Sequence, residues 1–197
     1  MRSLLIAVLL TFGAKGAMAE LLSLSTLSDY FNAMQTVEAP FRQINDDGSV
    51  STGKVYIKRP GRMRFEYDPP NDALVIARSS AVVIIDKKSN QPPETYPLRR
   101  TPLALILARN VDLTQARMVV GHGLDGDATI VTAQDPKNPE YGTIEMRFSA
   151  TPVELTEWVV RTDEGGTTKV VLGPLTKGRN LSSDLFDVDE YRRGEDR

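Results

Sequence analysis

The sequence predicts a mainly β protein with some α-helix: a single incomplete antiparallel β-barrel, or strongly curved sheet, with helices lidding an apolar cavity. Three observations carry this prediction. Beyond residue 50, runs of alternating apolar and polar residues recur between turn residues, which is typical of strands with one buried face. The chain has no cysteine, so a domain of this length must be held by its own core. Two apolar segments, 24–37 and 101–108, have helical features and can fill the concave side.

The first nineteen residues have the pattern of a cleaved secretory signal peptide. A cationic start, Met1–Ser3, precedes an uncharged apolar run at 4–12, and Ala17-Met18-Ala19 fits an A-x-A cleavage site. A membrane anchor is the alternative, but the apolar run is shorter than the about 20 residues that cross a bilayer. We therefore expect residues 1–19 to be removed and residues 20–197 to form one soluble exported domain without a lipid-bearing cysteine.

The charge of the exported domain argues against a general affinity for nucleic acid or anionic lipid. Removal of residues 1–19 takes away Arg2 and Lys15, which leaves 22 basic and 26 acidic residues and a net charge of −4. One basic cluster lies near residue 60, and strand alternation directs most of its side chains to one face. The cluster comprises Lys54, Lys58, Arg59, Arg62 and Arg64, and we predict a solvated sheet face for most of it, with Arg59 as the exception discussed below.

The first predicted element of the exported domain is an amphipathic helix over residues 24–37. Ser23 or Ser25 is a suitable cap for its start, and Pro40 prevents its continuation. Its apolar residues recur at helical spacing and comprise Leu24, Leu27, Phe31 and Met34, with Tyr30 widening the stripe.

A β-hairpin follows, with its turn at Pro60-Gly61. Val55 and Ile57 alternate with polar residues before the turn. After the turn the alternating apolar residues are Met63, Phe65 and Tyr67. Short, fully apolar strands are predicted at 74–76 and 82–85.

A second helix is predicted after these strands, with Thr101 as N-cap and Pro102 at its first position. This segment is apolar on nearly every side, so it must be covered all round or must itself cover something. Further strands are predicted at 116–121, 127–133, 142–149, 153–162 and 167–175, with a hairpin turn at Glu164-Gly165-Gly166 and a short last strand around Phe186. In the third of these strands, one face carries Ile144, Met146 and Phe148.

Residues that could carry catalysis are few, and we predict neither an enzyme, nor a metal site, nor a cofactor. The single histidine, His122, lies between glycines, and no second histidine or cysteine exists to complete a zinc site. Asp125 and Asp127 flank Gly126 in a predicted hairpin turn, where turn chemistry explains them. The chain contains neither a phosphate-binding P-loop motif nor a hydrolase nucleophile elbow.

The apolar faces of the strands predict a cavity, with ordinary core packing as the alternative. The mixture of Met and aromatic side chains favours a deformable pocket. Arg59 has the same parity as Val55 and Ile57, so an inward orientation would oblige its guanidinium to find acceptors. The predicted cavity residues are Val55, Ile57, Met63, Phe65, Tyr67, Ile144, Met146 and Phe148, and the predicted lid residues are Leu103 and Leu107.

Two stretches resemble a known family. Residues 53–71 read GKVYIKRPGRMRFEYDPPN, and residues 101–110 read TPLALILARN. Both closely resemble the outer-membrane lipoprotein carrier protein family, LolA, and the resemblance extends over the whole chain. It implies an incomplete barrel with an apolar cavity for lipoprotein acyl chains and a location in the periplasm. It further implies acylated lipoproteins as cargo, an inner-membrane ABC-type lipoprotein release complex and an outer-membrane lipoprotein receptor as partners, and a monomer that binds no nucleic acid. Arg59 falls on the arginine of the K-R-P segment, which in this family ties the lid shut through hydrogen bonds.

The physical chemistry of such a cargo agrees with a carrier. Each CH₂ of an acyl chain costs about 0.8 kcal/mol in water, so a triacylated protein carries a hydration penalty of tens of kcal/mol. Two other classes remain as alternatives. A lipid-sensing periplasmic regulator on the same open barrel would usually need a second interaction domain, for which the length leaves no room. An envelope hydrolase would need a catalytic triad or metal site, and neither is apparent.

Overall fold

The computed structural model describes residues 20–188, apart from residues 79, 90, 116 and 163–164. The predicted signal peptide lies outside these residues and stays a prediction, as does the part of the 163–166 turn contributed by Glu164. The described strands are β1 (Thr36–Asn45), β2 (Val50–Lys58), β3 (Arg62–Tyr67), β4 (Ala73–Arg78), β5 (Ala81–Asp86), β6 (Glu94–Pro97), β7 (Val119–Asp125), β8 (Ala128–Gln134), β9 (Thr143–Ala150), β10 (Val153–Arg161), β11 (Thr167–Leu172) and β12 (Thr176–Lys177).

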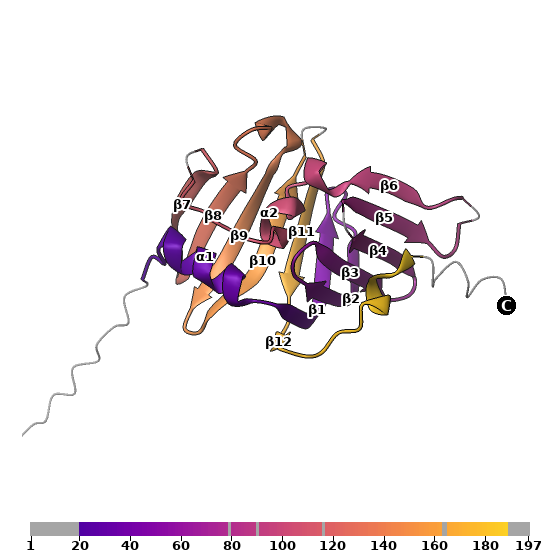
Figure 1. Ribbon diagram of the computed structural model, residues 1–197. Helices are drawn as coiled ribbons and strands as arrows, with labels where there is room; N and C mark the ends of the chain where they lie inside the picture. The colour runs from indigo at the N-terminus through magenta and orange to yellow at the C-terminus, as the bar shows by residue number, and fades with distance from the viewer. Residues whose placement is uncertain (1–19, 79, 90, 116, 163–164, 189–197) are drawn as a thin grey trace, which may run out of the picture.

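These strands form one antiparallel sheet in the order β6-β5-β4-β3-β2-β1-β11-β10-β9-β8-β7, with β12 paired to β1 beside it. Within the described residues, β6 and β7 are the two ends of this order and do not pair, so the sheet curves without closing (Figure 1). Strands that are neighbours in the sheet are mostly consecutive in sequence, because short hairpins join them. The predicted fold class, an incomplete antiparallel barrel with helices, is confirmed.

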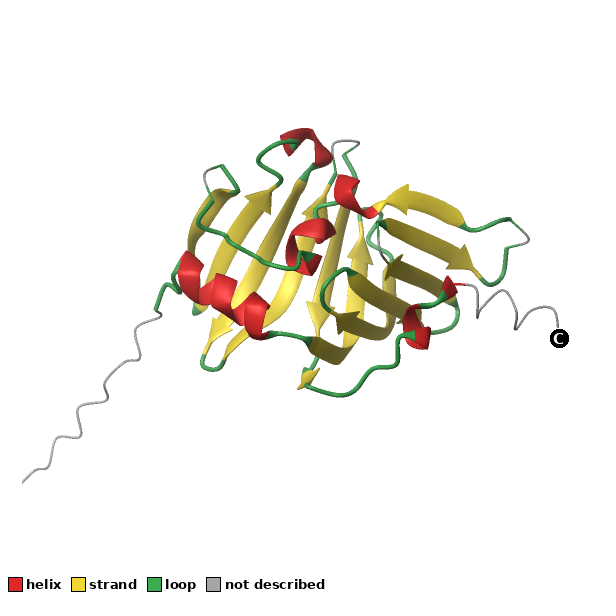
Figure 2. Cartoon of the chain, in the orientation of Figure 1, coloured by secondary structure: helices red, strands yellow, loops and turns green. Residues whose placement is uncertain are grey.

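Two α-helices lie on the concave side of the sheet, α1 (Leu24–Ala33) and α2 (Leu103–Leu107) (Figures 1 and 2). Ser23 is the N-cap of α1, and its Oγ accepts a hydrogen bond from the Thr26 backbone N–H at 3.1 Å. Helix α1 ends at Ala33 and does not continue to residue 37 as predicted. The reason is that Thr36 and Val37 pair with Lys58 and Ile57 of β2, and this pairing requires extended backbone.

The start of α2 also differs from the prediction. A 3₁₀ helix, η1 (Leu98–Arg100), precedes it, with Thr101 as its C-cap. The Thr101 hydroxyl donates to the Leu98 carbonyl at 2.8 Å, so it closes η1 and does not cap α2. Pro102 is the N-cap of α2 instead. This helix is only five residues long, and packing against the sheet must hold it, since so short a helix is unstable alone.

The convex side of the sheet has a small core of its own, which the C-terminal segment completes. Phe186, fully buried, and Leu181 pack on Leu74 and Ile76 of β4 and Ile85 of β5. The predicted last strand around Phe186 is wrong, because these residues form a 3₁₀ helix, η3 (Asp184–Phe186), whose position is set by packing on the sheet.

The same segment changes the interpretation of the basic cluster. Lys58 donates to the Leu181 carbonyl, and Arg64 Nη1 donates to the Leu185 carbonyl at 2.8 Å. Arg62 Nη1 lies 3.4 Å from the Ser183 Oγ. The prediction of a solvated face is therefore wrong for these three side chains, which bind the C-terminal segment, while Lys54 is exposed beside Glu38.

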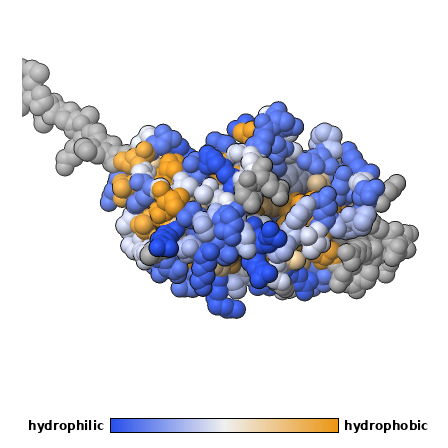
Figure 3. All heavy atoms as spheres, turned by 90° about the horizontal axis from the view of Figure 1, so that it is seen from above, coloured by the Kyte–Doolittle hydropathy of each residue, from blue (hydrophilic) through white to orange (hydrophobic). Residues whose placement is uncertain are grey.

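The end of the molecule where α1 and β7 meet is apolar on its surface. Figure 3 shows apolar side chains gathered there, and Leu21, Val120 and Leu124 are each about half exposed. His122 lies between the last two, and its Nε2 is 2.8 Å from the Leu22 carbonyl oxygen, which ties the start of α1 to β7. In the part of the chain that is described, no helix is both long enough and apolar enough to cross a membrane.

Candidate ligand-binding interior and its lid

One half of the apolar interior comes from the β2–β3 hairpin. Val55 is paired with Phe65, and Ile57 with Met63, so all four side chains point to the concave face. Each is buried, with exposure between 0% and 6%. The alternation predicted from the sequence is thus correct here, because the hairpin contains no bulge that would reverse the parity.

The other half comes from β9 and its neighbours. Ile144, Met146 and Phe148 are fully buried in the same apolar cluster as the β2–β3 side chains. Phe148 makes edge-to-face contacts with Tyr30 and Phe31 of α1, with ring centroids 5.9 and 5.8 Å apart. The structure therefore brings all eight predicted cavity residues to one interior, seven of them buried and Tyr67 at its margin.

Several residues of this interior were not predicted from the sequence. Trp158 is 1% exposed, and its ring lies edge-on to that of Phe65 across the interior, with ring centroids 6.3 Å apart. The pairing of β10 with β9 shifts register between Leu155 and Glu157, so Leu155 and Trp158 face the same side although three positions apart. The only sequence signal for Trp158 was that it is the one tryptophan of the chain.

A cluster of aromatic rings lies at the margin of the interior, near the C-terminal end of β3. Phe41 of β1 lies edge-to-face with both Phe65 and Tyr67, with ring centroids 5.1 Å apart in each case. The Tyr67 hydroxyl donates to Gln43 Oε1 at 2.6 Å, which satisfies its polar end. Burial raises the pKa of Tyr67 to about 12, so this group is neutral at physiological pH.

Helix α2 is tied to the turn between β2 and β3. Arg59 is 5% exposed, and its Nη2 donates to the Ala108 carbonyl at 2.6 Å. The Gly61 N–H donates to the Leu107 carbonyl at 2.9 Å, so two hydrogen bonds hold the end of the helix. Among the described residues, Arg59 Nε has no hydrogen-bond partner, and burial lowers the pKa of the guanidinium. The predicted inward orientation of Arg59 agrees with this geometry.

Helix α1 is tied in turn to the segment that follows α2. The Asn32 side-chain amide makes two hydrogen bonds with Val111, donating to its carbonyl and accepting from its N–H, both at 2.9 Å. Ser28 Oγ accepts from the Leu113 N–H at 3.0 Å. The two helices and residues 108–113 thus form a continuous lid over the interior, with Leu107 buried beneath it and Leu103 partly buried.

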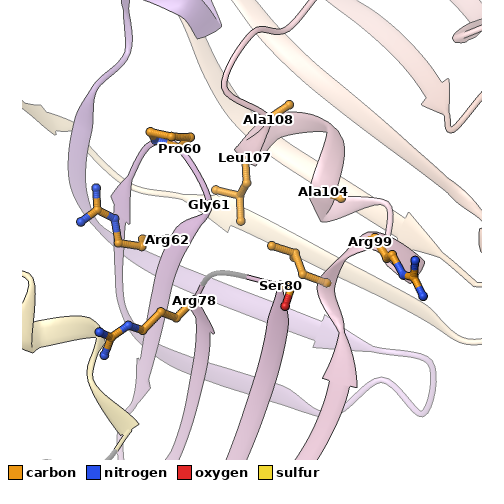
Figure 4. A pocket seen from close by; sticks show the side chains of 10 residues that line it. Pro60, Gly61, Arg62, Arg78, Ser80, Arg99, Ala104, Leu107 and Ala108 are labelled. Atoms are coloured by element: carbon orange, nitrogen blue, oxygen red, sulfur yellow. The ribbon is translucent and has the colours of Figure 1, made fainter.

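A hollow of about 530 Å³ lies beside this lid, between α2 and the β2–β3 turn (Figure 4). Leu107 belongs to both the hollow and the buried interior. Of the ten predicted cavity and lid residues, Leu107 is the one that lines it. The full lining is Pro60, Gly61, Arg62, Arg78, Ser80, Leu98, Arg99, Ala104, Leu107 and Ala108.

Two of the side chains considered for catalysis, Asp125 and His122, have structural partners. Asp125 ends β7 and forms an ion pair with Arg147 at 2.5 Å, and Gly126 supplies the positive φ of the turn. Among the described residues, no three His, Cys, Asp or Glu side chains gather in a way that could hold a metal ion. The arrangement of the interior suits the burial of apolar groups.

An open antiparallel sheet that curves round an apolar interior, under helices held by a few hydrogen bonds, defines a class of lidded incomplete barrels. The family model of the outer membrane lipoprotein carrier protein LolA matches residues 32–189, so this chain belongs to the LolA family.

Individual relatives agree with this assignment. The outer-membrane lipoprotein carrier protein of Coxiella burnetii (strain CbuK_Q154) is 26% identical over 175 residues, covering 84% of this chain and 82% of the relative. That of Cupriavidus necator is 27% identical over 173 residues, covering 81% and 80%. Among solved structures, a Vibrio parahaemolyticus domain described for outer membrane lipoprotein sorting superposes with a TM-score of 0.51 at 9% identity. It covers 86% of this chain and 97% of that domain, and shows similarity of fold.

Proposed function

We propose that this chain is a periplasmic carrier that takes up the acyl chains of lipoproteins released from the inner membrane and delivers them to the outer membrane. Membership of the LolA family supports the general carrier role. The observation that carries the proposal is the lid: a buried apolar interior lies under two helices, and two hydrogen bonds, from Arg59 and Gly61, hold the end of α2 to the β2–β3 turn. Such a lid can open at a modest cost in free energy. Transfer of acyl chains from water into the interior offsets that cost.

The proposed cycle needs partners but no chemical step. An inner-membrane ABC-type complex would load the carrier, and an outer-membrane receptor would unload it. The interior side chains pack on one another in one buried cluster. Met63 and Met146 are unbranched and can be displaced more easily than β-branched side chains. We assign the protein no catalytic residue and no cofactor.

Residues 1–19 are proposed to direct export and then to be removed. The expected mature protein starts at Glu20 and fractionates with soluble periplasmic material. N-terminal sequencing of fractionated cells checks this. Recovery of an intact Met1 terminus in the membrane pellet would contradict it.

Capture of a purified lipoprotein tests the carrier function directly. Residues 20–197 should bind a triacylated lipoprotein and should not bind the same protein with its acylated cysteine replaced by serine. Equal binding of the two forms, or binding of neither, would refute the proposal.

Substitutions in the interior then test the site. Phe65→Asp and Met63→Asp should weaken capture by several kcal/mol, since the charge would face acyl chains. Leu103→Asp, at a partly exposed lid position, gives the same test with less risk to folding. Val50→Asp is the matched control, because Val50 lies on β2 but is 54% exposed. Folded variants that capture cargo like wild type would place the site elsewhere.

A further inference from the structure

Strand β7 is an open edge of the sheet. Within the described residues no strand pairs with its outer side, and it stands at one end of the sheet in Figure 1. It contains neither proline nor lysine, two residues that commonly protect a free edge from pairing. Its one carboxylate, Asp125, is its last residue and forms an ion pair with Arg147. The backbone of β7 is therefore accessible to a further strand.

One face of this edge strand is apolar and exposed. Val120 and Leu124 are 54% and 46% exposed, and His122 lies between them on the same face, because side chains alternate along a strand. The bond from His122 to the Leu22 carbonyl brings Leu21, 44% exposed, to the same end of the molecule. Figure 3 shows the apolar patch that gathers there. An accessible backbone beside exposed apolar side chains suits another strand as partner.

The sequence of β7 and its flanks is self-complementary about His122. If two copies of the strand run antiparallel with His122 opposite His122, residues equally far before and after this position lie opposite each other. The resulting pairs are Val120 with Leu124, Gly121 with Gly123, and the exposed Arg117 with the exposed Asp127. Apolar residues thus meet apolar residues, glycine meets glycine, and a cation meets an anion at each end. The one shift of register against β8 lies between Val119 and Gly121, so the rest of the strand is regular.

We propose that β7 pairs with β7 of a second copy of this chain, antiparallel and centred on His122, to form a two-fold symmetric dimer with one continuous sheet. A two-fold interface requires a surface that complements itself, and the residues around His122 meet this requirement. One strand pair is a small interface, so we expect a dissociation constant of about 0.1 mM. The inference goes beyond the proposed function, and it departs from the monomer that the family resemblance implies.

Sedimentation velocity of residues 20–197, at concentrations from about 0.01 to 1 mM, tests the dimer. Leu124→Lys should raise the dissociation constant at least about tenfold, because it places a charge from each copy in the apolar contact. Val50→Lys is the matched control, since Val50 is a similarly exposed apolar residue of β2, and it should dimerise like wild type. Wild-type protein that stays monomeric over this range would overturn the proposal. So would a monomer whose binding to phospholipid vesicles is lost in Leu124→Lys, because the patch would then be a membrane contact.

Charge reversal tests the register of the pairing. Arg117→Glu and Asp127→Arg should each weaken dimerisation by about tenfold, because each variant places like charges opposite each other at both ends of the contact. A mixture of the two variants should recover the affinity of wild type, since each then offers the charge that the other needs. Absence of recovery in the mixture would overturn the antiparallel register.

A single introduced cysteine tests the two-fold axis. The chain has no cysteine, so His122→Cys adds its only thiol. In the proposed dimer this thiol faces its own copy and should form an intermolecular disulfide under mild oxidation. Leu124→Cys is the matched control, because its two thiols would lie four positions apart along the strands, about 13 Å, which is beyond the reach of a disulfide. Cross-linking of Leu124→Cys as fast as that of His122→Cys would overturn the pairing. Lipoprotein capture is a separate measurement, so the carrier function and this inference can fail independently.

Discussion

Replacement of Arg59 by leucine is expected to favour the open lid and to slow release of cargo. The substitution removes the 2.6 Å hydrogen bond to the Ala108 carbonyl, which exists only while α2 lies against the hairpin. A hydrogen bond from a charged donor contributes about 1.5–3 kcal/mol. The buried Nε, which lacks a partner within the described residues, offsets about 1 kcal/mol of that by its desolvation. The net loss of about 0.5–2 kcal/mol corresponds to about a two- to thirtyfold shift towards the open lid.

Two measurements check this shift. In the protein without cargo, amide hydrogen exchange of residues 103–108 should become about two- to thirtyfold faster, measured at a pH where the lid recloses faster than its exposed amides exchange. In the loaded protein, transfer of lipoprotein to outer-membrane vesicles should slow, because leucine adds apolar surface that retains acyl chains. Arg62→Leu is the matched control, since Arg62 lies on the same hairpin but its guanidinium is directed to Ser183. Wild-type exchange and wild-type transfer in Arg59→Leu would refute the reasoning.

Three further outcomes follow from contacts elsewhere. Asn32→Ala removes both hydrogen bonds to Val111 and should lower the free energy of unfolding by about 1–3 kcal/mol in a denaturant titration, with faster exchange in both lid helices; faster exchange in α1 alone would contradict the shared lid. Phe186→Ala should cost about 3–5 kcal/mol in the same titration, and a loss under about 1 kcal/mol would contradict the second core. Because the pKa of Tyr67 is raised from 10.0 to about 12, its stabilising effect is complete below pH 10 and is lost as the pH rises towards 12. Partial solvent access limits this loss in the free energy of unfolding to about 1–2 kcal/mol. Tyr67→Phe should abolish the loss, and the same pH dependence of unfolding in this variant and in wild type would contradict the assignment.

The sequence predicted the interior best where strand pairing is regular. Val55 and Phe65 face each other across a hairpin without bulges, so a period of two assigns their faces correctly. The bulge after Leu155 has no local sequence marker, and it turned Trp158 towards the interior without a recognisable pattern. Regular alternation therefore predicts one half of the interior completely and the other half in part.

Contacts between distant segments were the other limit. The apolar spacing that ends at Met34 extends a helical pattern past Ala33, where pairing with β2 imposes a strand. Arg64 has the parity of an exposed residue, and nothing near it in sequence shows that residue 185 lies over it. Asn32 is an ordinary helix-face residue until the chain folds Val111 against it, 79 residues later. These partners are set by the tertiary fold, which local patterns do not contain.

The convex core can be completed only late in synthesis of the chain. Leu181 and Phe186 are added to the chain after every strand that they cover. Until they arrive, Leu74, Ile76 and Ile85 form an apolar strip on strands close to the free edge at β6, a surface prone to pairing with other chains. The lid can close over the concave side earlier, since α2 and β10 precede the C-terminal segment. A newly made chain can thus enclose its apolar interior while the convex strip is still exposed, and protection by a chaperone matters most in that interval.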